Sequence, residues 1–482
     1  MDASPGAMLR MLVPKVPLIL KTTVAHSVGL SETASKWDLK TELTIKVIRS
    51  FLNTKHPTPI SKAQKGSLRD PGVKGRMWVS RVELPAPAED DIREVLFKAI
   101  DDLNVGGEAY YQRPDARSVT AEWTGYRANV GKEEPEPEIS EPEKYANLMK
   151  ENGSTPTILY FHGGAYYLMD PATHRPSTSQ LAHLSGGRVL SVRYRLAPKH
   201  PFPAALLDAL LAYLSLLYPP PDALHAPVPA SSIIFAGDSA GGNLSFALLG
   251  LLLHLNRSGA ATLNFHGQQV SLPLPAGVAT NSPWLDVTRS MPSIATNLKY
   301  DYLPPRVPVA NMAPIPPCDL WPATPPRADL FCHAAMLSHP LVSPLAAPSE
   351  FWTGAPPLFF TLGEEMLEDE GRVVARRAAK AGVTVVWVEF EAMPHCFGML
   401  FAGTPGSRRC FEEWGRFCKA VGNGEAVVTK GTFLRAKTLA AEEVEVATMR
   451  AVEDAEVARL MEEVRQEQVR HEATQMKEVA KL

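Results

Sequence analysis

Ser239 is the residue around which a hydrolytic site could be built. It is the apex of Gly237-Asp238-Ser239-Ala240-Gly241, which follows an apolar run and precedes an apolar helical pattern over residues 244–255. A serine at a sharp turn between a strand and a helix is the context of the G-x-S-x-G nucleophile elbow. The two glycines are required because side chains there would collide across the turn. A serine hydroxyl alone is a poor nucleophile, so this chemistry also needs a base and a carboxylate.

A histidine and several carboxylates follow the serine in the chain order that this chemistry expects. His395 lies in a loop after the β-branched and aromatic run 383–390. We predict it as the base that takes the serine proton and returns it to the leaving group. A carboxylate that orients the imidazole is expected after the preceding strand. The candidates there include Glu364, Glu365 and Asp369, and their order alone leaves the choice among them open.

A glycine turn before the elbow could bind the oxyanion of such a reaction. His162-Gly163-Gly164-Ala165 comes directly after the apolar run 157–161. Because glycines let backbone N–H groups point into a cavity, we predict Gly163 and Gly164 as donors, with the N–H of Ala240 as the third. Loss of one such donor costs roughly 100- to 1,000-fold in rate. His162 is predicted to brace this loop by hydrogen bonds rather than to act as the base.

Strands alternate with helices through the part of the chain that carries these residues. Short apolar runs predict strands at 157–161, 189–194, 232–236, 276–283, 357–362 and 383–390, and helical patterns lie at 204–217 and 368–381. This alternation predicts an α/β fold with a mainly parallel sheet and helices on both faces. Such sheets place their chemistry beyond the carboxyl ends of the strands.

The rest of the chain divides by composition. Residues 1–125 carry mixed patterns, with helices predicted at 43–52 and 91–103 and strands at 78–84 and 121–127, and we assign them to an N-terminal cap or accessory region. Residues 126–425 form the predicted catalytic domain. Within it, residues 286–352 are a proline-rich insertion that we predict as a lid. Residues 426–482 are predicted to be a helical tail on the body or on a partner.

Composition excludes several classes of function. A net charge of −3 gives no electrostatic argument for nucleic acid as a partner. The five cysteines are odd in number and lack a C-x-x-C pair, which argues against disulfides and zinc and favours a reducing, cytoplasmic location. The apolar stretch 8–30 is broken by prolines and lysines, so it is neither a signal peptide nor a membrane span. It is basic and poor in acids, which leaves an organelle signal or a membrane-surface contact as alternatives to an amphipathic segment packed on the body.

Several motifs together resemble the hormone-sensitive-lipase-like branch of the α/β-hydrolases, and fungal members of it in particular. These motifs are the His-Gly-Gly-Ala turn at 162–165, Tyr-Arg-Leu-Ala-Pro at 194–198, Gly-Asp-Ser-Ala-Gly-Gly at 237–242, Ser-Pro-Trp-Leu-Asp at 282–286 and the loop of His395. The resemblance covers about residues 150–420. It implies the α/β-hydrolase fold, hydrolysis of carboxylic esters without cofactor or metal, and a cap built from N-terminal helices and the insertion.

The acid position departs from the pattern of this branch. Its members usually carry Asp-x-Leu-x-Asp there, and aligning Leu367 and Asp369 with that motif places Glu365 where the first aspartate would be. Glutamate serves as the acid in some hydrolases of this fold. We therefore expect Glu365 to be the acid, Asp369 to be the runner-up in a supporting position, and Glu364 to be third.

The substrate pocket is less well defined by the sequence. Four aromatic residues near the motifs either line the acyl or alcohol pocket or belong to the core: Tyr166, Tyr167, Trp284 and Phe397. The expected function is that of a serine esterase that forms an acyl-enzyme with a small-molecule ester. Two alternatives are a non-catalytic small-molecule-binding homologue and a membrane-associated deacetylase of the steryl-acetate type.

Overall fold

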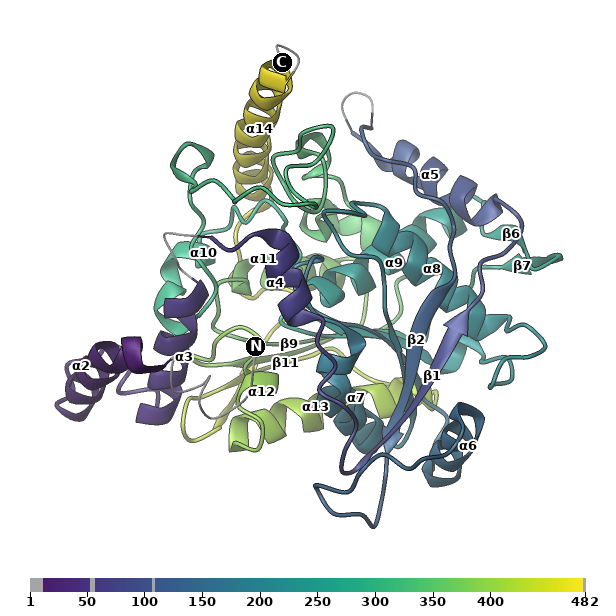
Figure 1. The fold of residues 1–482 in the computed structure, drawn as a ribbon, viewed down its shortest axis with the longest axis horizontal. Helices are drawn as coiled ribbons and strands as arrows, with labels where there is room; N and C mark the ends of the chain where they lie inside the picture. Colours follow the sequence, from purple (N-terminus) through teal and green to yellow (C-terminus); the bar gives the residue numbers. More distant parts are fainter. Residues whose placement is uncertain (1–11, 53–56, 106–108, 480–482) are drawn as a thin grey trace.

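The computed structural model describes residues 12–52, 57–105 and 109–479. Its centre is a ten-stranded sheet in the order β1-β2-β4-β3-β5-β8-β9-β10-β11-β12 (Figure 1). The strands are β1 (Met77–Leu84), β2 (Val119–Tyr126), β3 (Thr157–Phe161), β4 (Arg188–Val192), β5 (Ile233–Asp238), β8 (Gly277–Asn281), β9 (Leu358–Gly363), β10 (Val385–Phe390), β11 (Lys430–Leu434) and β12 (Ala441–Val444). The strands from β4 to β11 pair in parallel, and β1, β2 and β12 are antiparallel to their neighbours. The predicted mainly parallel sheet is confirmed.

Helices cover both faces of the sheet. The described helices are α2 (Val16–Ser27), α3 (Leu39–Leu52), α4 (Ile60–Ser67), α5 (Asp91–Leu103), α6 (Glu141–Glu151), α7 (Pro171–Ser185), α8 (Ala204–Leu217), α9 (Ala240–Arg257), α10 (Ser293–Thr296), α11 (Glu368–Lys380), α12 (Phe397–Leu400), α13 (Pro405–Gly422) and α14 (Asp454–Val479). A short hairpin of β6 (Thr262–Phe265) and β7 (Gln268–Ser271) follows α9. Figure 1 shows α2 and α3 together at one end of the molecule and α14 at its top.

Two hydrophobic cores lie on opposite faces of the sheet. Alternate residues of one strand enter different cores, as Leu159 and Phe161 join one while Ile158 and Tyr160 join the other. The larger core includes α5, α8, α9 and α11, and the smaller includes α7 and α13. Because the central strands are covered on both faces, they are apolar on both faces, which explains their continuous apolar runs in the sequence. All fourteen residues of α8 are buried for the same reason.

Both the predicted N-terminal cap region and the predicted C-terminal tail contribute strands to the central sheet. Strands β1 and β2 lie within the region predicted as an N-terminal cap, and β2 pairs with β4 of the central sheet. Residues 426–482 are not a helical tail throughout, because β11 and β12 come before α14. Strand β11 pairs with the outer edge of β10, with Phe433 opposite Glu389. This pairing satisfies backbone groups that the edge would otherwise leave open, and it overrides the helical composition of the segment.

Candidate active site

The chain makes a strained turn at Ser239, between β5 and α9. Ser239 has φ 52° and ψ −120°, a positive φ that non-glycine residues rarely adopt. Its N–H donates to the carbonyl of Asn281 at 3.1 Å, and its own carbonyl accepts from the N–H of Trp284 at 3.0 Å. These bonds hold the strained backbone on both sides. The hydroxyl therefore stands at the N-terminal end of the 18-residue helix α9, where the helix dipole is positive.

Glycines allow this turn to lie directly against β3. A Cβ on Gly241 would come within 1.8 Å of the carbonyl oxygen of Phe161, and one on Gly237 within 2.5 Å of the same oxygen. Real Cβ atoms do not approach backbone oxygens so closely. The two glycines of the elbow are thus required by close approach, as the sequence predicts.

His395 lies in the loop after β10 and reaches the serine. Its Nε2 is 2.9 Å from the Oγ of Ser239, and its Nδ1 is 2.8 Å from Oε1 of Glu365. The backbone of the loop is fixed by Ser282, whose Oγ accepts from the N–H of Cys396 at 3.0 Å. The imidazole is buried. The structure therefore brings Ser239, His395 and Glu365 into one hydrogen-bonded line.

Glu365 is fully buried in the loop after β9 and has partners on both oxygens. Its Oε2 accepts from the hydroxyl of Ser282 at 2.6 Å and from the N–H of Gly363 at 3.2 Å, while Oε1 faces His395. Burial raises the pKa of Glu365, and the imidazole of His395 opposes that rise. The pKa of His395 is also raised: burial of the ring lowers it, and the interactions of the ring with Cys396 and Glu365 raise it by more.

The other two acid candidates are bound elsewhere. Asp369 accepts from the N–H of Ser293 at 2.8 Å, at the start of α10 in the insertion. Glu364 accepts from the N–H of Ala392 at 3.0 Å. Both carboxylates hold backbone near the site, and the structure brings neither into hydrogen-bond contact with His395.

The predicted oxyanion donors need one correction. The N–H of Gly163 donates to Oδ1 of Asp238 at 3.1 Å, so it is already engaged behind the elbow. A Cβ at Gly163 would lie 2.3 Å from Oδ2 of the same carboxylate, so this glycine serves close packing. Within the described chain, the N–H groups of Gly164, Ala165 and Ala240 donate no hydrogen bond. The sequence predicts Gly163 and Gly164 alike as oxyanion donors, because the contact between Gly163 and Asp238 exists only in the folded chain.

Asp238 organises the buried side of this turn. Besides Gly163, it accepts from the hydroxyl of Tyr160 at 2.6 Å and lies 3.4 Å from Nε2 of His174. Burial raises the pKa of Asp238, but the charge of His174 and these hydrogen bonds lower it by more, so the net shift is downward. Nδ1 of His162 lies 2.7 Å from the carbonyl oxygen of Gly163. Burial lowers the pKa of His162 to about 4, which fits the predicted bracing position rather than proton transfer.

The four aromatic residues considered for the pocket are placed differently from one another. Phe397 is buried in the smaller core, with 4.6 Å between the centroids of its ring and that of Phe390. Tyr166 is buried, and its hydroxyl donates to Oδ1 of Asn243 at 2.8 Å. Its ring stacks on Phe331 of the insertion, with 3.8 Å between centroids. Tyr167 and Trp284 are partly exposed.

Two residues at the site have no role in the sequence argument. Ser282, described above, bonds both the acid and the loop of the base. Asp301 in the insertion is fully buried, and it accepts from the N–H of Met366 at 2.8 Å and from that of His395 at 3.4 Å. Ser282 is part of a motif and could have been found from it. Asp301 lies in the proline-rich stretch with no spacing signal, so only the folded chain reveals it.

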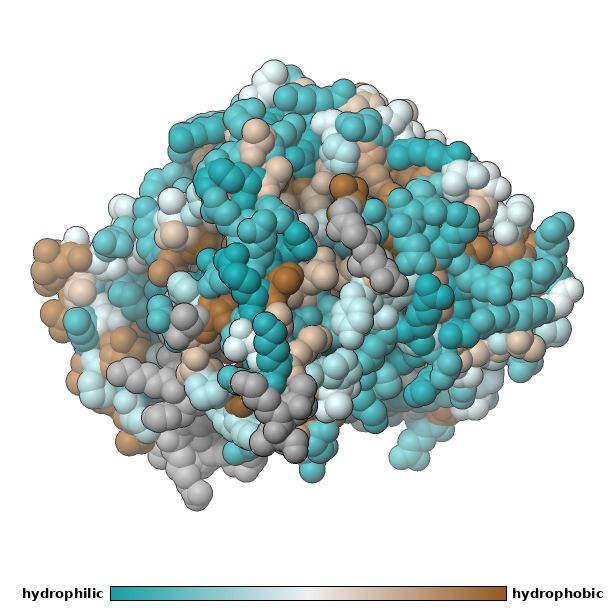
Figure 2. Space-filling model, turned by 90° about the horizontal axis from the view of Figure 1, so that it is seen from above, coloured by the Kyte–Doolittle hydropathy of each residue, from teal (hydrophilic) through white to brown (hydrophobic). Residues whose placement is uncertain are grey.

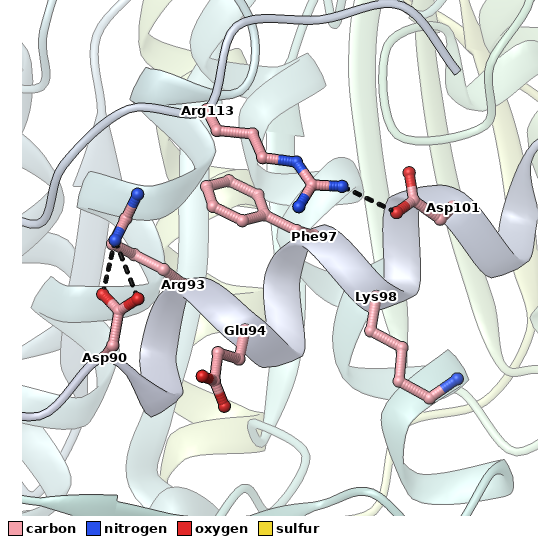
Figure 3. Close-up of a pocket in the computed structure, with 7 residues that line it drawn as sticks. All are labelled: Asp90, Arg93, Glu94, Phe97, Lys98, Asp101 and Arg113. Carbon is pink, nitrogen blue, oxygen red and sulfur yellow. Dashed lines mark hydrogen bonds and ion pairs between the residues drawn. The ribbon is translucent and has the colours of Figure 1, made fainter. Parts of the chain in front are cut away.

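A separate surface hollow of about 440 Å³ runs along α5 (Figure 3). Its lining residues are Asp90, Arg93, Glu94, Phe97, Lys98, Asp101 and Arg113. Arg93 pairs with Asp90 at 2.6 Å, and Arg113 pairs with Asp101 at 3.2 Å, both visible as dashed lines in Figure 3. The hollow contains no residue of the loops after β5, β9 and β10. Its charged groups neutralise one another, so it offers no catalytic arrangement.

Among the described residues, no group of three or more His, Cys, Asp or Glu side chains could hold a metal ion. Within the same ranges, no helix has the length and apolar content to cross a membrane.

Known proteins resemble this chain in sequence and in fold. The family model described as alpha/beta hydrolase fold matches residues 158–399, which is half of the chain. An acetyl-hydrolase of Streptomyces hygroscopicus is 33% identical over 270 residues, which are 56% of this chain and 77% of that protein. An esterase of Acinetobacter venetianus is 28% identical over 270 residues, 56% of this chain and 76% of that one. The crystal structure of EstE5 soaked with p-nitrophenyl butyrate has a TM-score of 0.53 at 22% identity, covering 80% of this chain and 99% of EstE5, and this likeness shows the fold.

Proposed function

The chain belongs to the α/β-hydrolase fold family, and on this premise we propose that it is a serine esterase that cleaves carboxylic esters through an acyl-enzyme. One observation carries the proposal: the line from Glu365 through His395 to Ser239, with 2.8 Å and 2.9 Å between the bonded atoms. The relatives named as an acetyl-hydrolase and an esterase support the same class of substrate.

In the attack step, the Oγ of Ser239 adds to the ester carbonyl as its proton passes to Nε2 of His395. This requires a neutral imidazole whose Nδ1 carries the hydrogen, and Glu365 favours that tautomer because its carboxylate can only accept at Nδ1. Once the imidazolium forms, its positive charge lies beside the buried carboxylate. The hydroxyl of Ser282 and the N–H of Gly363 keep this carboxylate oriented, since both donate to its other oxygen.

The tetrahedral oxyanion would be held by backbone donors that are free in the resting protein. We assign this task to the N–H groups of Gly164, Ala165 and Ala240, which replace the predicted set that included Gly163. Gly164 has φ 106°, and a Cβ there would meet the carbonyl oxygen of Leu168 at 2.3 Å. A side chain at Gly164 would therefore force the turn to move and would misplace these donors.

The intermediate then collapses, and His395 returns the proton to the departing alkoxide. The acyl group stays on Ser239 as an ester. Water takes the place of the alcohol, gives a proton to Nε2 and adds to the acyl carbonyl, and the second collapse releases the acid and restores the serine hydroxyl. Each half-reaction uses the same base and the same oxyanion donors.

The insertion 286–352 and the N-terminal helices form the cover of this site in our proposal. Tyr302 of the insertion lies with its ring 6.2 Å from that of His395. From α4, the side chain of Gln64 donates to the carbonyl oxygens of Tyr167 and Ala197 at 2.9 and 3.0 Å, so this helix is attached to the oxyanion turn. A cover built from these segments would limit which esters reach Ser239.

The direct test is hydrolysis of a p-nitrophenyl acyl ester series by the wild-type protein and by Ser239→Ala. We expect turnover by the wild type and its loss in the variant. The chain-length profile would then report the size of the acyl site. A Ser245→Ala variant is a matched control, because Ser245 is a buried serine of α9 whose hydroxyl donates to the carbonyl of Gly241. Turnover that persists in Ser239→Ala would contradict the proposal.

A further inference from the structure

Helix α2 turns its apolar side outward. Val16, Leu20, Val24 and Val28 recur every four residues and are 45, 61, 63 and 60% exposed. Spacing of this kind places side chains on one face of a helix. Figure 2 shows apolar side chains at the left edge of the molecule, the edge where α2 lies in Figure 1. The exposed face of α2 is therefore a continuous apolar stripe.

The side of α2 that faces the body is mixed, with Leu18 and Ile19 partly buried there beside the polar Thr22 and His26. Thr22 is its one buried residue, at 2% exposure. His26 lies 2.6 Å from the carboxylate of Glu42 on α3, and just before the helix the ammonium of Lys15 donates to the carbonyl of Ser50. A surface helix of a globular protein normally keeps a polar outer face, so the exposed apolar stripe of α2 is unusual. The sequence led us to expect an amphipathic segment packed on the body, and the stripe of Val16, Leu20 and Val24 is the part of this helix that lies outside that contact.

The charge around the stripe indicates what could cover it. No Asp or Glu occurs from Leu12 to Ser31, and Lys21 is exposed on the helix itself. Residues 12–52 carry six Lys or Arg side chains and three carboxylates, while the whole chain has a net charge of −3. An apolar stripe beside the exposed Lys21, in a segment without carboxylates, fits the boundary between acyl chains and anionic headgroups of a lipid surface. A helix of 12 residues spans roughly 18 Å, which suits lying in that boundary and not crossing it.

We propose that α2 docks this protein on an anionic phospholipid surface, with Val16, Leu20, Val24 and Val28 inserted among the lipids. This docking is a property of the protein surface and does not depend on the proposed esterase activity. If the proposed esterase function also holds, docking would present the site to esters held in or beside the lipid.

The helix that supports α2 is connected to the loops of the catalytic centre. Arg49 at the end of α3 donates to the carbonyl of Asp301 at 2.9 Å, and the side chain of Asp301 binds the backbone of Met366 and His395. Between α2 and α3, the indole N–H of Trp37 donates to the carbonyl of Ala392 at 2.6 Å, close to the loop of the base. The docking face and the catalytic centre are therefore parts of one connected structure.

The test is flotation of the full chain with vesicles of phosphatidylcholine alone and with about 30% phosphatidylserine. We expect binding to the anionic vesicles, little binding to the neutral ones, and weaker binding as salt rises. Leu20→Ser with Val24→Ser should lower the bound fraction by about tenfold or more. The matched control is Val105→Ser with Val428→Ser, which removes two exposed valines outside α2 and should leave binding unchanged.

Several results would overturn the proposal. The wild type could stay unbound with every vesicle, or the α2 variant could bind as well as the control. A wild-type dimer in sedimentation that becomes a monomer in the α2 variant would assign the stripe to a second copy of the chain. Hydrolysis of a soluble p-nitrophenyl ester, measured in parallel, keeps the two proposals separate. Loss of vesicle binding with full hydrolysis would concern docking alone, and binding without any hydrolysis would contradict only the esterase function.

Discussion

The proposed catalytic centre and the proposed cover above it are held together in different ways. Short loops at the carboxyl ends of β5, β9 and β10 carry Ser239, Glu365 and His395. The hydrogen bond between His395 and Glu365 is buried, and the one between His395 and Ser239 is partly buried. The cover is a long irregular insertion whose position depends on charged side chains from helices near the two ends of the chain. On one side the guanidinium of Arg49 on α3 donates to the carbonyl of Asp301 in the insertion.

On the other side the cover is held by α14. The carboxylate of Glu472 accepts from the N–H groups of Ala328 and Ala334, at 2.9 and 3.1 Å, and faces the ring of His333. Five residues earlier on the same helix, Glu467 pairs with Arg306 of the insertion. The loops at the carboxyl ends of the strands therefore position the reacting groups in this account. Helices α3 and α14 position the insertion that covers them. Changes in the centre should therefore act on kcat, and changes in the cover should act mainly on KM.

The largest expected contrast lies within one loop, between Glu365→Gln and Asp369→Asn. Loss of the charge beside His395 should lower kcat/KM by roughly 10³- to 10⁴-fold. The amide introduced by Asp369→Asn would keep an oxygen that can accept from Ser293, so this variant should lose less than about tenfold. Steady-state kinetics on a p-nitrophenyl ester compares the two. A larger loss in Asp369→Asn would assign the acid to Asp369.

The pH dependence of kcat/KM provides a second test of the pairing between Glu365 and His395. Burial raises the pKa of the Cys396 thiol to about 11, so at neutral pH Glu365 supplies the negative charge that raises the pKa of His395. Only the neutral imidazole accepts a proton, and kcat/KM should therefore rise with pH as the imidazolium is lost. Glu365→Gln removes the anion, lowers the pKa of His395 and should move this rising limb to lower pH. A limb that stays in place or moves upward in the pH–rate profile would contradict the pairing.

Asp301 belongs to the insertion but binds the backbone of the two loops that carry Glu365 and His395, so its substitution shows how far the cover affects the centre. Asp301→Ala leaves the N–H groups of Met366 and His395 without their acceptor, and both loops should shift. We expect kcat/KM to fall by about 10- to 100-fold, chiefly through kcat. Asp301→Asn keeps one acceptor oxygen and should recover part of the loss. Thermal melts monitor folding, and a variant that melts lower but keeps the wild-type kcat would give Asp301 a purely structural role.

The smallest effect is expected at the far side of the cover. Glu472→Gln weakens the attachment of residues 328–334 to α14, and Phe331 in that segment stacks on Tyr166. KM should rise by about threefold to tenfold while kcat changes little. Glu478→Gln, at an exposed position of the same helix, is the control and should behave as the wild type. A fall in kcat with constant KM would contradict the division between centre and cover.

The sequence predicts the parts of the molecule that local rules determine. The elbow follows from Gly237 and Gly241, because tight packing against Phe161 permits no other residue. The parallel sheet follows from apolar runs that alternate with helical patterns. The choice of Glu365 needed the alignment of its loop with a family motif, since three carboxylates lie close together there.

Other features depend on contacts between distant segments. Gly163 differs from Gly164 only because Asp238 lies beside it, and Asp301 is 65 residues from the Met366 N–H that it binds. Strand β11 forms because β10 offers an edge, although its neighbourhood in the sequence favours helix. Which side of α2 faces outward depends on how the helix packs on the rest of the protein. The periodicity of its apolar residues is the same for either orientation and does not determine it.

The most direct test of the catalytic assignment is the site of reaction with a fluorophosphonate probe. The probe phosphonylates a serine only when a base activates it. Peptide mass mapping of the labelled wild-type protein should find one adduct, on Ser239, and labelling should be much slower in Glu365→Gln. An unlabelled protein, or an adduct on a different serine, would contradict the proposal that Ser239, His395 and Glu365 form the catalytic centre of an esterase.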